Sequence, residues 1–547
     1  MQQPEYVLRG TIRTMGTHGV AEALHIRGSQ IAAVGGVGLA DDLASRGVTV
    51  IDAPHDGAVL PAFVDPHVHL TQYAVATARG VDCRVPHCTG IADVIDALRD
   101  RARETPAGEW VIGYGNLFFD QKLAERRFPT RAELDAVSTR HPIVIHCGGH
   151  VSILNSAALE AARVERFLHA GMGLWGSPVV GLGDDGNPNG YVAEVDGHLP
   201  IPAPSAEETT AWVRERFAAD YLANGVVTVG EMLESEAQLS ALETLAADEA
   251  VACRIALYAI APGFRPVDEV FDWVDGFGGT PGRLWAQGVK MFVDGGYSAR
   301  NAASMRPYSP DHAPRPGYRG RLNKSRAELL HAFGLAAQHG VQLALHTNGT
   351  RAQAEVLEAL TGFGRRIDVR VEHLGNVLED VADIDAWKAA GVIPVLQPGF
   401  LSNFIGDYLP MLFPGHGVSG RVPLRTILDA AVSPAFSSDV AVGGDIGATN
   451  PWHTIWSAVA RRSFWGIVVE PTESISVEEA LRAHTIDAAH ALGASSRLGS
   501  LEAGKEADIV IVDRDPVHSS LDELAGTQTL AVYRAGEQVF ASPRVMA

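Results

Sequence analysis

The chain has 547 residues, of which 46% are hydrophobic and 20% are charged. This length exceeds one ordinary domain and suits a barrel of roughly 250 residues with substantial additions. The formal net charge is −21. Such an acidic balance, without any basic tract, argues against a nucleic-acid partner, because those partners are bound by clustered Lys and Arg.

No segment of the sequence resembles a membrane span or a targeting signal. The longest apolar runs are strand-sized, shorter than the ~20 residues that cross a bilayer, and the first residues lack a basic segment followed by an apolar stretch. The four cysteines form no Cys-x-x-Cys pair. We therefore expect a soluble, cytoplasmic protein with reduced cysteines, a small-molecule substrate and no membrane partner.

Both ends of the chain predict short strands. Apolar positions alternate and glycines interrupt them at 6–13, 23–27, 30–34 and 48–52, and the same pattern returns at 508–513 and 529–533. We expect a small antiparallel sheet at the start and one composite β-sandwich assembled from residues 1–58 and 490–547.

Between the two ends, strand-like apolar segments alternate with helical patterns, which is typical of a parallel α/β structure. The segments lie at 60–65, 226–231, 254–259, 289–293, 342–346, 370–373, 392–397 and 435–439. Their number and order predict a (β/α)8 TIM-like barrel over residues 59–489.

Two connections in this barrel are unusually long. Residues 70–203 separate the first two strands and predict an inserted subdomain, at about 70–205, that roofs the active site. Residues 295–323 follow the fourth strand at the catalytic face of the barrel, and we expect them to form a substrate loop.

The first strand ends in the pair His67 and His69. Residues i and i+2 of a strand point to the same side, so both imidazoles can reach one metal ion. A lone His-x-His is a weak signal, equally compatible with two unrelated polar residues. Further residues at other strand ends strengthen it.

Four more residues with ligand chemistry follow the barrel strands. Lys290 lies within an apolar strand, where a charged amine is costly and a lowered pKa would let it form a carbamate. His346, His373 and Asp439 end the fifth, sixth and eighth strands. All project to one end of a barrel, and these ligand types suit Zn²⁺ or a related divalent ion.

The order His-x-His, Lys, His, His, Asp resembles the binuclear amidohydrolases. Over nearly its whole length the chain is similar to the YtcJ-like branch (amidohydrolase 3) of that superfamily, which includes enzymes that deformylate N-substituted formamides. The similar segments are LPAFVDPHVH at 60–69, PTRAELD at 129–135, Gly149-His150 with NSAAL at 155–159, VKMFVDG at 289–295, VEH at 371–373 and LGSLEAGKEAD at 498–508.

The resemblance implies one or two divalent ions, most of all Zn²⁺. The more buried ion would be held by His67, His69, Lys290 and Asp439, and the more exposed one by carboxylated Lys290, His346 and His373. It also implies hydrolysis of the C–N bond of an amide in a small substrate that has an apolar substituent. The amide could be an N-formyl or an N-acyl amide. Metal-bound hydroxide would attack the carbonyl carbon, and Asp439 would carry a proton to the leaving amine. Large acidic barrels of this kind are often homodimers.

Two residues of the inserted subdomain, His150 and Asn155, are candidates for substrate contact, although ordinary polar contacts within the subdomain explain them equally well. Three departures from the family pattern are also present. Ala62 replaces the usual Gly of the first-strand motif, which we expect to affect packing only. Thr350 stands where the family has an acid, and we expect it to cap the following helix. Residues 440–445 lack the usual Ala-Pro and are expected to reshape the substrate side.

Other activities remain open. The same metal centre could hydrolyse an ester, a carbamate or a cyclic amide, or deaminate a ring, because this barrel hosts many reactions. An alternative of another class is a non-catalytic scaffold that has lost its metals. The presence of all six ligand types argues against that alternative.

Overall fold

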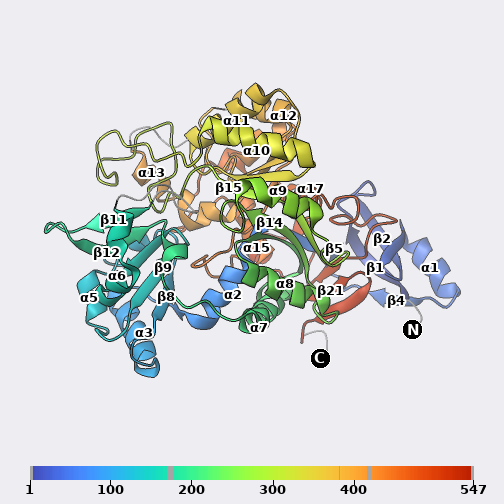
Figure 1. Cartoon of the computed structure of the whole chain (residues 1–547). Coiled ribbons are helices and arrows are strands. Elements are labelled where there is room, and N and C mark those ends of the chain that lie inside the picture. Colours follow the sequence, from blue (N-terminus) through green and yellow to red (C-terminus); the bar gives the residue numbers. More distant parts are fainter. Residues whose placement is uncertain (1–3, 169–177, 381, 415–419, 544–547) are drawn as a thin grey trace.

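The computed structural model describes residues 4–168, 178–380, 382–414 and 420–543 (Figure 1). Its centre is an eight-stranded parallel sheet in the order β19-β18-β17-β16-β15-β14-β13-β6. The strands are β6 (Phe63–Val68), β13 (Val226–Leu233), β14 (Arg254–Ile260), β15 (Leu284–Phe292), β16 (Gln342–His346), β17 (Val369–Glu372), β18 (Ile393–Leu396) and β19 (Ala435–Phe436). This arrangement confirms the predicted barrel.

The first and last strands of the barrel are brought together at their carboxyl ends. The backbone N–H of Ser438 donates to the Asp65 carboxylate over 3.0 Å, and the N–H of Asp439 donates to the His67 carbonyl over 3.0 Å. These bonds nearly close the barrel at the end where the predicted metal ligands lie.

Helices cover the outside of the barrel (Figure 1). They are α7 (Ala206–Arg216), α8 (Glu236–Ala247), α9 (Val267–Gly276), α10 (Arg326–His339), α11 (Thr350–Phe363), α12 (Ala382–Ala390), α14 (Leu424–Asp429), α15 (Pro451–Ala460), α16 (Val477–Ala483) and α17 (Ile486–Ala491). Apart from α17, their apolar faces pack with the barrel strands in one large buried cluster. The alanines of α17 pack in two smaller clusters that also contain barrel-strand residues. The large cluster fixes the strand ends on which the site is built.

The first barrel strand begins later than predicted. Residues 60–65 belong to two strands, β5 (Ala58–Pro61) and β6, and the chain changes sheet at Ala62. The Ala62 N–H donates to Asp508 of the terminal sheet, whereas the Phe63 N–H donates to Gly225 of the barrel. Because every residue from Ala58 to Val68 is buried, the continuous apolar run does not mark the change of sheet.

The long connection after β6 starts with α2 (Leu70–Arg79) and folds around a separate six-stranded sheet in the order β11-β12-β10-β9-β8-β7. Its elements are β7 (Val81–Asp82), α3 (Ile91–Glu104), β8 (Val111–Gly115), α4 (Phe119–Lys122), α5 (Arg131–Asp135), β9 (Ile143–Cys147), β10 (Val151–Leu154), α6 (Ser156–Ala162), β11 (Val179–Leu182) and β12 (Pro188–Ala193). We call this part the insert.

The two ends of the chain share a third sheet, in the order β22-β21-β20-β5-β1-β2-β3, with β4 paired to β1. Its elements are β1 (Glu5–Arg13), β2 (Val20–Arg27), β3 (Gln30–Gly35), α1 (Val37–Ser45), β4 (Thr49–Asp52), β5, β20 (Ile509–Val512), α18 (Leu521–Ala525), β21 (Thr529–Arg534) and β22 (Glu537–Ala541). The expected antiparallel pairing holds for β1, β2 and β3, but it is wrong for β4 and β5, which both pair in parallel with β1. Among the described residues, no helix is long and apolar enough to cross a bilayer.

Candidate metal centre

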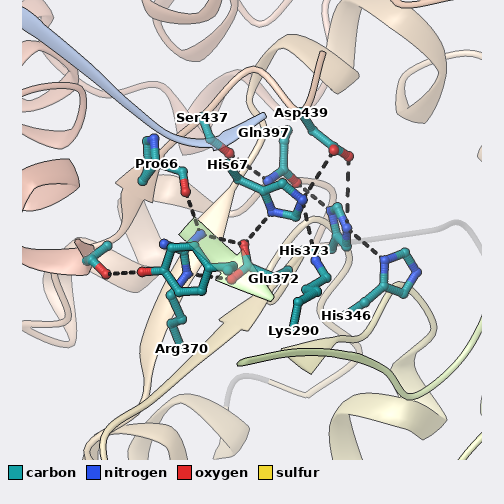
Figure 2. A network of polar contacts seen from close by, with 12 residues as sticks. Pro66, His67, Lys290, His346, Arg370, Glu372, His373, Gln397, Ser437 and Asp439 are labelled. Carbon is teal, nitrogen blue, oxygen red and sulfur yellow. Dashed lines mark hydrogen bonds and ion pairs between the residues drawn. The ribbon is translucent and has the colours of Figure 1, made fainter. Parts of the chain in front are cut away.

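Three of the predicted ligands, His67, His69 and Asp439, meet at one end of the barrel, and Figure 2 shows His67 and Asp439 side by side. Asp439 Oδ1 lies 3.3 Å from His67 Nε2 and 3.6 Å from His69 Nε2. One ligand atom from each residue lies within 4.8 Å of the other two. The pair of histidines at the end of β6 therefore faces the aspartate that follows β19, as one metal ion requires.

The other three predicted ligands lie beside these residues. Lys290 Nζ lies 3.3 Å from His67 Nε2. His373 Nε2 lies 3.9 Å from Asp439 Oδ2 and 3.2 Å from His346 Nδ1. All six side chains thus converge, with Lys290 beside His67 and with His373 between Asp439 and His346.

Backbone strain accompanies two of these residues. His373 directly follows β17, Asp439 lies three residues after the end of β19, and they adopt left-handed φ angles of 67° and 49°. Residues other than glycine seldom adopt this conformation, and it persists where the surrounding structure enforces it, often at functional sites. Here the strain turns both side chains into the mouth of the barrel.

Outer partners hold the imidazole rings in place. His67 Nδ1 contacts Glu372 Oε2 over 2.5 Å, and His373 Nδ1 contacts Gln397 Oε1 over 2.7 Å. His69 Nδ1 lies 3.8 Å from Glu234 Oε1. Metal-binding histidines commonly use their second nitrogen in this way, which fixes the tautomer and the ring orientation.

Glu372 is a functional residue that the sequence reasoning missed. It is fully buried at the end of β17, where the Arg370 guanidinium donates to both of its oxygens over 2.5 and 3.0 Å. Burial opposes the charged form, but the charges of Arg370 and His67 lower the pKa of Glu372 well below its usual value. Its position inside an apolar strand could have identified it, because a buried charged group is costly unless it has a partner. The same argument identified Lys290.

The protonation states of the imidazoles suit a metal ion. Burial lowers the pKa of His67 and His346 well below the usual value, that of His69 to about 4 and that of His373 to about 3. The rings are therefore neutral at pH 7, which is the form that binds metal. Neutral histidines beside a carboxylate form a donor set that fits a divalent ion such as Zn²⁺.

Replacement of Glu372 by Gln is expected to weaken metal binding about 10- to 100-fold, because the outer partner of His67 loses its charge. The dissociation constant for Zn²⁺, measured by competition with a chromogenic chelator, tests this. Glu470→Gln is the control, since it removes a glutamate paired with Arg421 elsewhere in the chain. An unchanged Zn²⁺ affinity in the Glu372 variant would show that Glu372 serves only to pair with Arg370.

A cavity of about 420 Å³ opens over the metal centre, within the range typical of small-molecule sites. The insert supplies part of its wall, including Phe118 and His150, and the barrel supplies Phe292, Phe400 and Phe404. Aromatic side chains from both the insert and the barrel are therefore part of the surface that a substrate would meet.

The two candidate substrate residues lie in different places. His150 lines the cavity, and its Nδ1 lies 3.1 Å from Glu194 Oε2. Asn155 lies outside the cavity wall, fully buried at the N-cap of α6. Its side chain accepts from Ile143 and Ala158 and donates to Ser138 and His141, so its polar atoms are used within the insert.

Residues 440–445 form a stretch of cavity wall that is attached to the insert. Val440, Val442 and Asp445 line the cavity. The buried ammonium of Lys122 lies 2.9 Å from Asp445 Oδ1, and Asn116 Nδ2 donates to the same oxygen over 2.7 Å. The insert therefore fixes the position of this segment.

The expectation that Thr350 caps the helix after β16 is wrong. Thr350 is the first residue of α11, and the N-cap is Gly349, without a side-chain cap. The Thr350 hydroxyl instead accepts from Met305 N–H and donates to Glu379. The N–H groups of Asn348 and Gly349 donate to the buried Asp294 carboxylate, which orders the turn before the helix.

Comparisons with known proteins agree with this geometry. A family model described as "Amidohydrolase family" matches residues 49–540. The chain is 28% identical to N-substituted formamide deformylase of Arthrobacter pascens, over 97% of each protein, and 23% identical to putative amidohydrolase YtcJ of Bacillus subtilis, over 84% of this chain and 85% of that protein. A metal-dependent hydrolase from Pyrococcus horikoshii has the same fold, with a TM-score of 0.71 and 24% identity over 95% of this chain and 99% of that one.

Proposed function

Since the chain belongs to the amidohydrolase family, we propose that it is a metal-dependent hydrolase that cleaves the C–N bond of an amide. The observation that carries this proposal is the convergence of His67, His69 and Asp439 beside Lys290 at the carboxyl end of the barrel. In barrels of this type, catalysis takes place at that end.

A divalent ion held by these residues would acidify a water molecule and polarise the substrate carbonyl. The residues of the chain provide the rest of the chemistry. Asp439 accepts the proton of the attacking water and delivers it to the departing nitrogen. Burial raises the pKa of Asp439, although the charges of His69 and Lys290 oppose the shift. The raised pKa helps the carboxylate to hold a proton during the reaction.

The cavity supports an apolar substituent on the amide. Phe118, Phe400, Phe404 and Val440 face it, and apolar area removed from water on binding favours a substrate with an aryl or alkyl group. The N-formyl amides are the first class to test, because the Arthrobacter pascens relative is a deformylase of N-substituted formamides.

The test combines metal analysis with a substrate panel. Purified protein is expected to contain between about one and two divalent ions per chain, zinc foremost, and to hydrolyse N-benzyl- or N-alkylformamides faster than the matching esters or carbamates. Preferential turnover of an ester, a cyclic amide or an aminated ring would change the substrate class. Folded protein without metal and without any hydrolysis would favour the non-catalytic scaffold.

A further inference from the structure

The insert places one side chain directly over the metal centre. His150 follows β9 in a tight turn, where Gly148 and Gly149 have φ angles of 67° and 73°, values that glycine adopts without strain. The ring of His150 lies 6.1 Å from the ring of His346, centroid to centroid. The turn therefore projects His150 from the insert towards the predicted ligands.

A buried carboxylate supports this histidine. Glu194 follows β12, is 1% exposed, and its Oε2 lies 3.1 Å from His150 Nδ1. Its backbone N–H donates to the His150 carbonyl over 2.9 Å, so side chain and backbone hold the same residue. Glu194 also has a left-handed φ of 57°, an uncommon conformation outside glycine.

The barrel leaves room for the pair. Gly295 and Gly296, in the connection after β15, lie against Glu194 and His150. A Cβ atom on Gly295 would lie 2.6 Å from Glu194 Oε1, and one on Gly296 would lie 2.7 Å from His150 Cδ2. Any larger residue at either position would displace the pair, so these glycines are needed for close approach.

One nitrogen of His150 is left for another partner. The contact with Glu194 uses Nδ1, and among the described residues no hydrogen bond reaches Nε2. The side chain lines the cavity that contains His69 and His346. A pair with a purely structural role would not need an imidazole edge that faces the substrate space.

We propose that His150 is a further catalytic residue, which hydrogen-bonds the scissile amide through Nε2, and that Glu194 is its positioning residue. This inference rests on the proposed function and deepens it. The insert then contributes to the chemistry as well as to the cavity wall. Removal of a positioned hydrogen-bonding group that acts on the reacting atoms commonly lowers kcat by about 10²-fold.

His150→Ala is the first test. We expect kcat on the best N-formyl amide to fall about 10- to 100-fold, with wild-type metal content and melting temperature. His150→Gln should recover part of the loss, because its side-chain amide can place a hydrogen-bonding atom near the position of Nε2. His87→Ala is the matched control, since His87 is an exposed histidine of the insert that lies 3.8 Å from Asp82.

Gly296→Ala tests the geometry without altering either polar group. Gly296 does not have a positive φ, so alanine fits its backbone and only the added methyl group acts on His150. We expect a loss of kcat similar to that of His150→Ala, and almost no additional loss in the double variant, because both changes disable one unit.

Two results would overturn the inference. One is near-wild-type kcat in His150→Ala with its metal present, and the other is loss of metal in parallel with activity, which would make His150 a support of the metal site. If His150→Ala does not fold, the double variant of His150→Gln and Gly296→Ala replaces it. Losses of kcat that add up in that double variant would also overturn the inference. Failure of the proposed function looks different, because wild-type protein would then hydrolyse no amide in the panel.

Discussion

Asp439→Asn is expected to lower kcat on the best N-formyl or N-acyl amide by about 10²-fold or more, the usual effect of losing a positioned acid/base group. The amide isostere preserves the shape of the side chain but cannot hold and release the proton. The strained backbone at Asp439 and its N–H bond to His67 are unaffected by the substitution, so the variant should fold.

The measurement combines kcat with metal content on the same sample. The variant is expected to keep at least the ion bound near His346 and His373 and to bind substrate with little change in KM. Asp429→Asn is the control, because Asp429 is an exposed acid paired with Arg425 on α14. Near-wild-type turnover with metals in place would mean that Asp439 is only a metal ligand.

Lys290→Ala should reduce metal content and activity together, with kcat at least about 10²-fold lower, if its carbamate bridges two ions. Burial lowers the pKa of Lys290 to about 8, so an appreciable fraction of the amine is neutral near physiological pH and can react with CO₂. A small carboxylate such as acetate or propionate is expected to restore part of both losses by occupying the vacated space.

Lys290→Met separates the bridging role from burial alone, because it fills the same space without a reactive nitrogen. It should lose metal as Lys290→Ala does. High-resolution density for an unmodified amine in metal-loaded protein would contradict the bridging role. A one-metal centre would then be favoured.

The barrel could be predicted from the sequence because its strands are short apolar runs between amphipathic helices. Lys290, His346 and Asp439 were visible as strand residues with unusual chemistry. The boundary at Ala62 could not be predicted, because residues on both sides of it are buried and apolar although they belong to different sheets.

The outer partners were harder to predict than the ligands. Glu372 and Glu194 are both buried acids beside a histidine, but their partners, His67 and His150, lie 305 and 44 residues away. Sequence spacing carries no sign of such long-range pairs. Asn155 was instead named as a candidate for substrate contact, because it lies in a segment similar to the family. Its side chain forms hydrogen bonds at the N-cap of α6.

The terminal sheet has a consequence for the synthesis of the protein. In that sheet β5 lies between β1 and β20, so the last residues of the chain supply one neighbour of a strand made near its beginning. The roughly 450 residues between them take about 20–90 s to translate at about 5–20 residues per second. For that time the edge of β5 that pairs with β20 has unpaired N–H and C=O groups, which are prone to pair with other chains. We therefore expect correct folding to depend on protection of this edge until β20 has been made and can pair with β5.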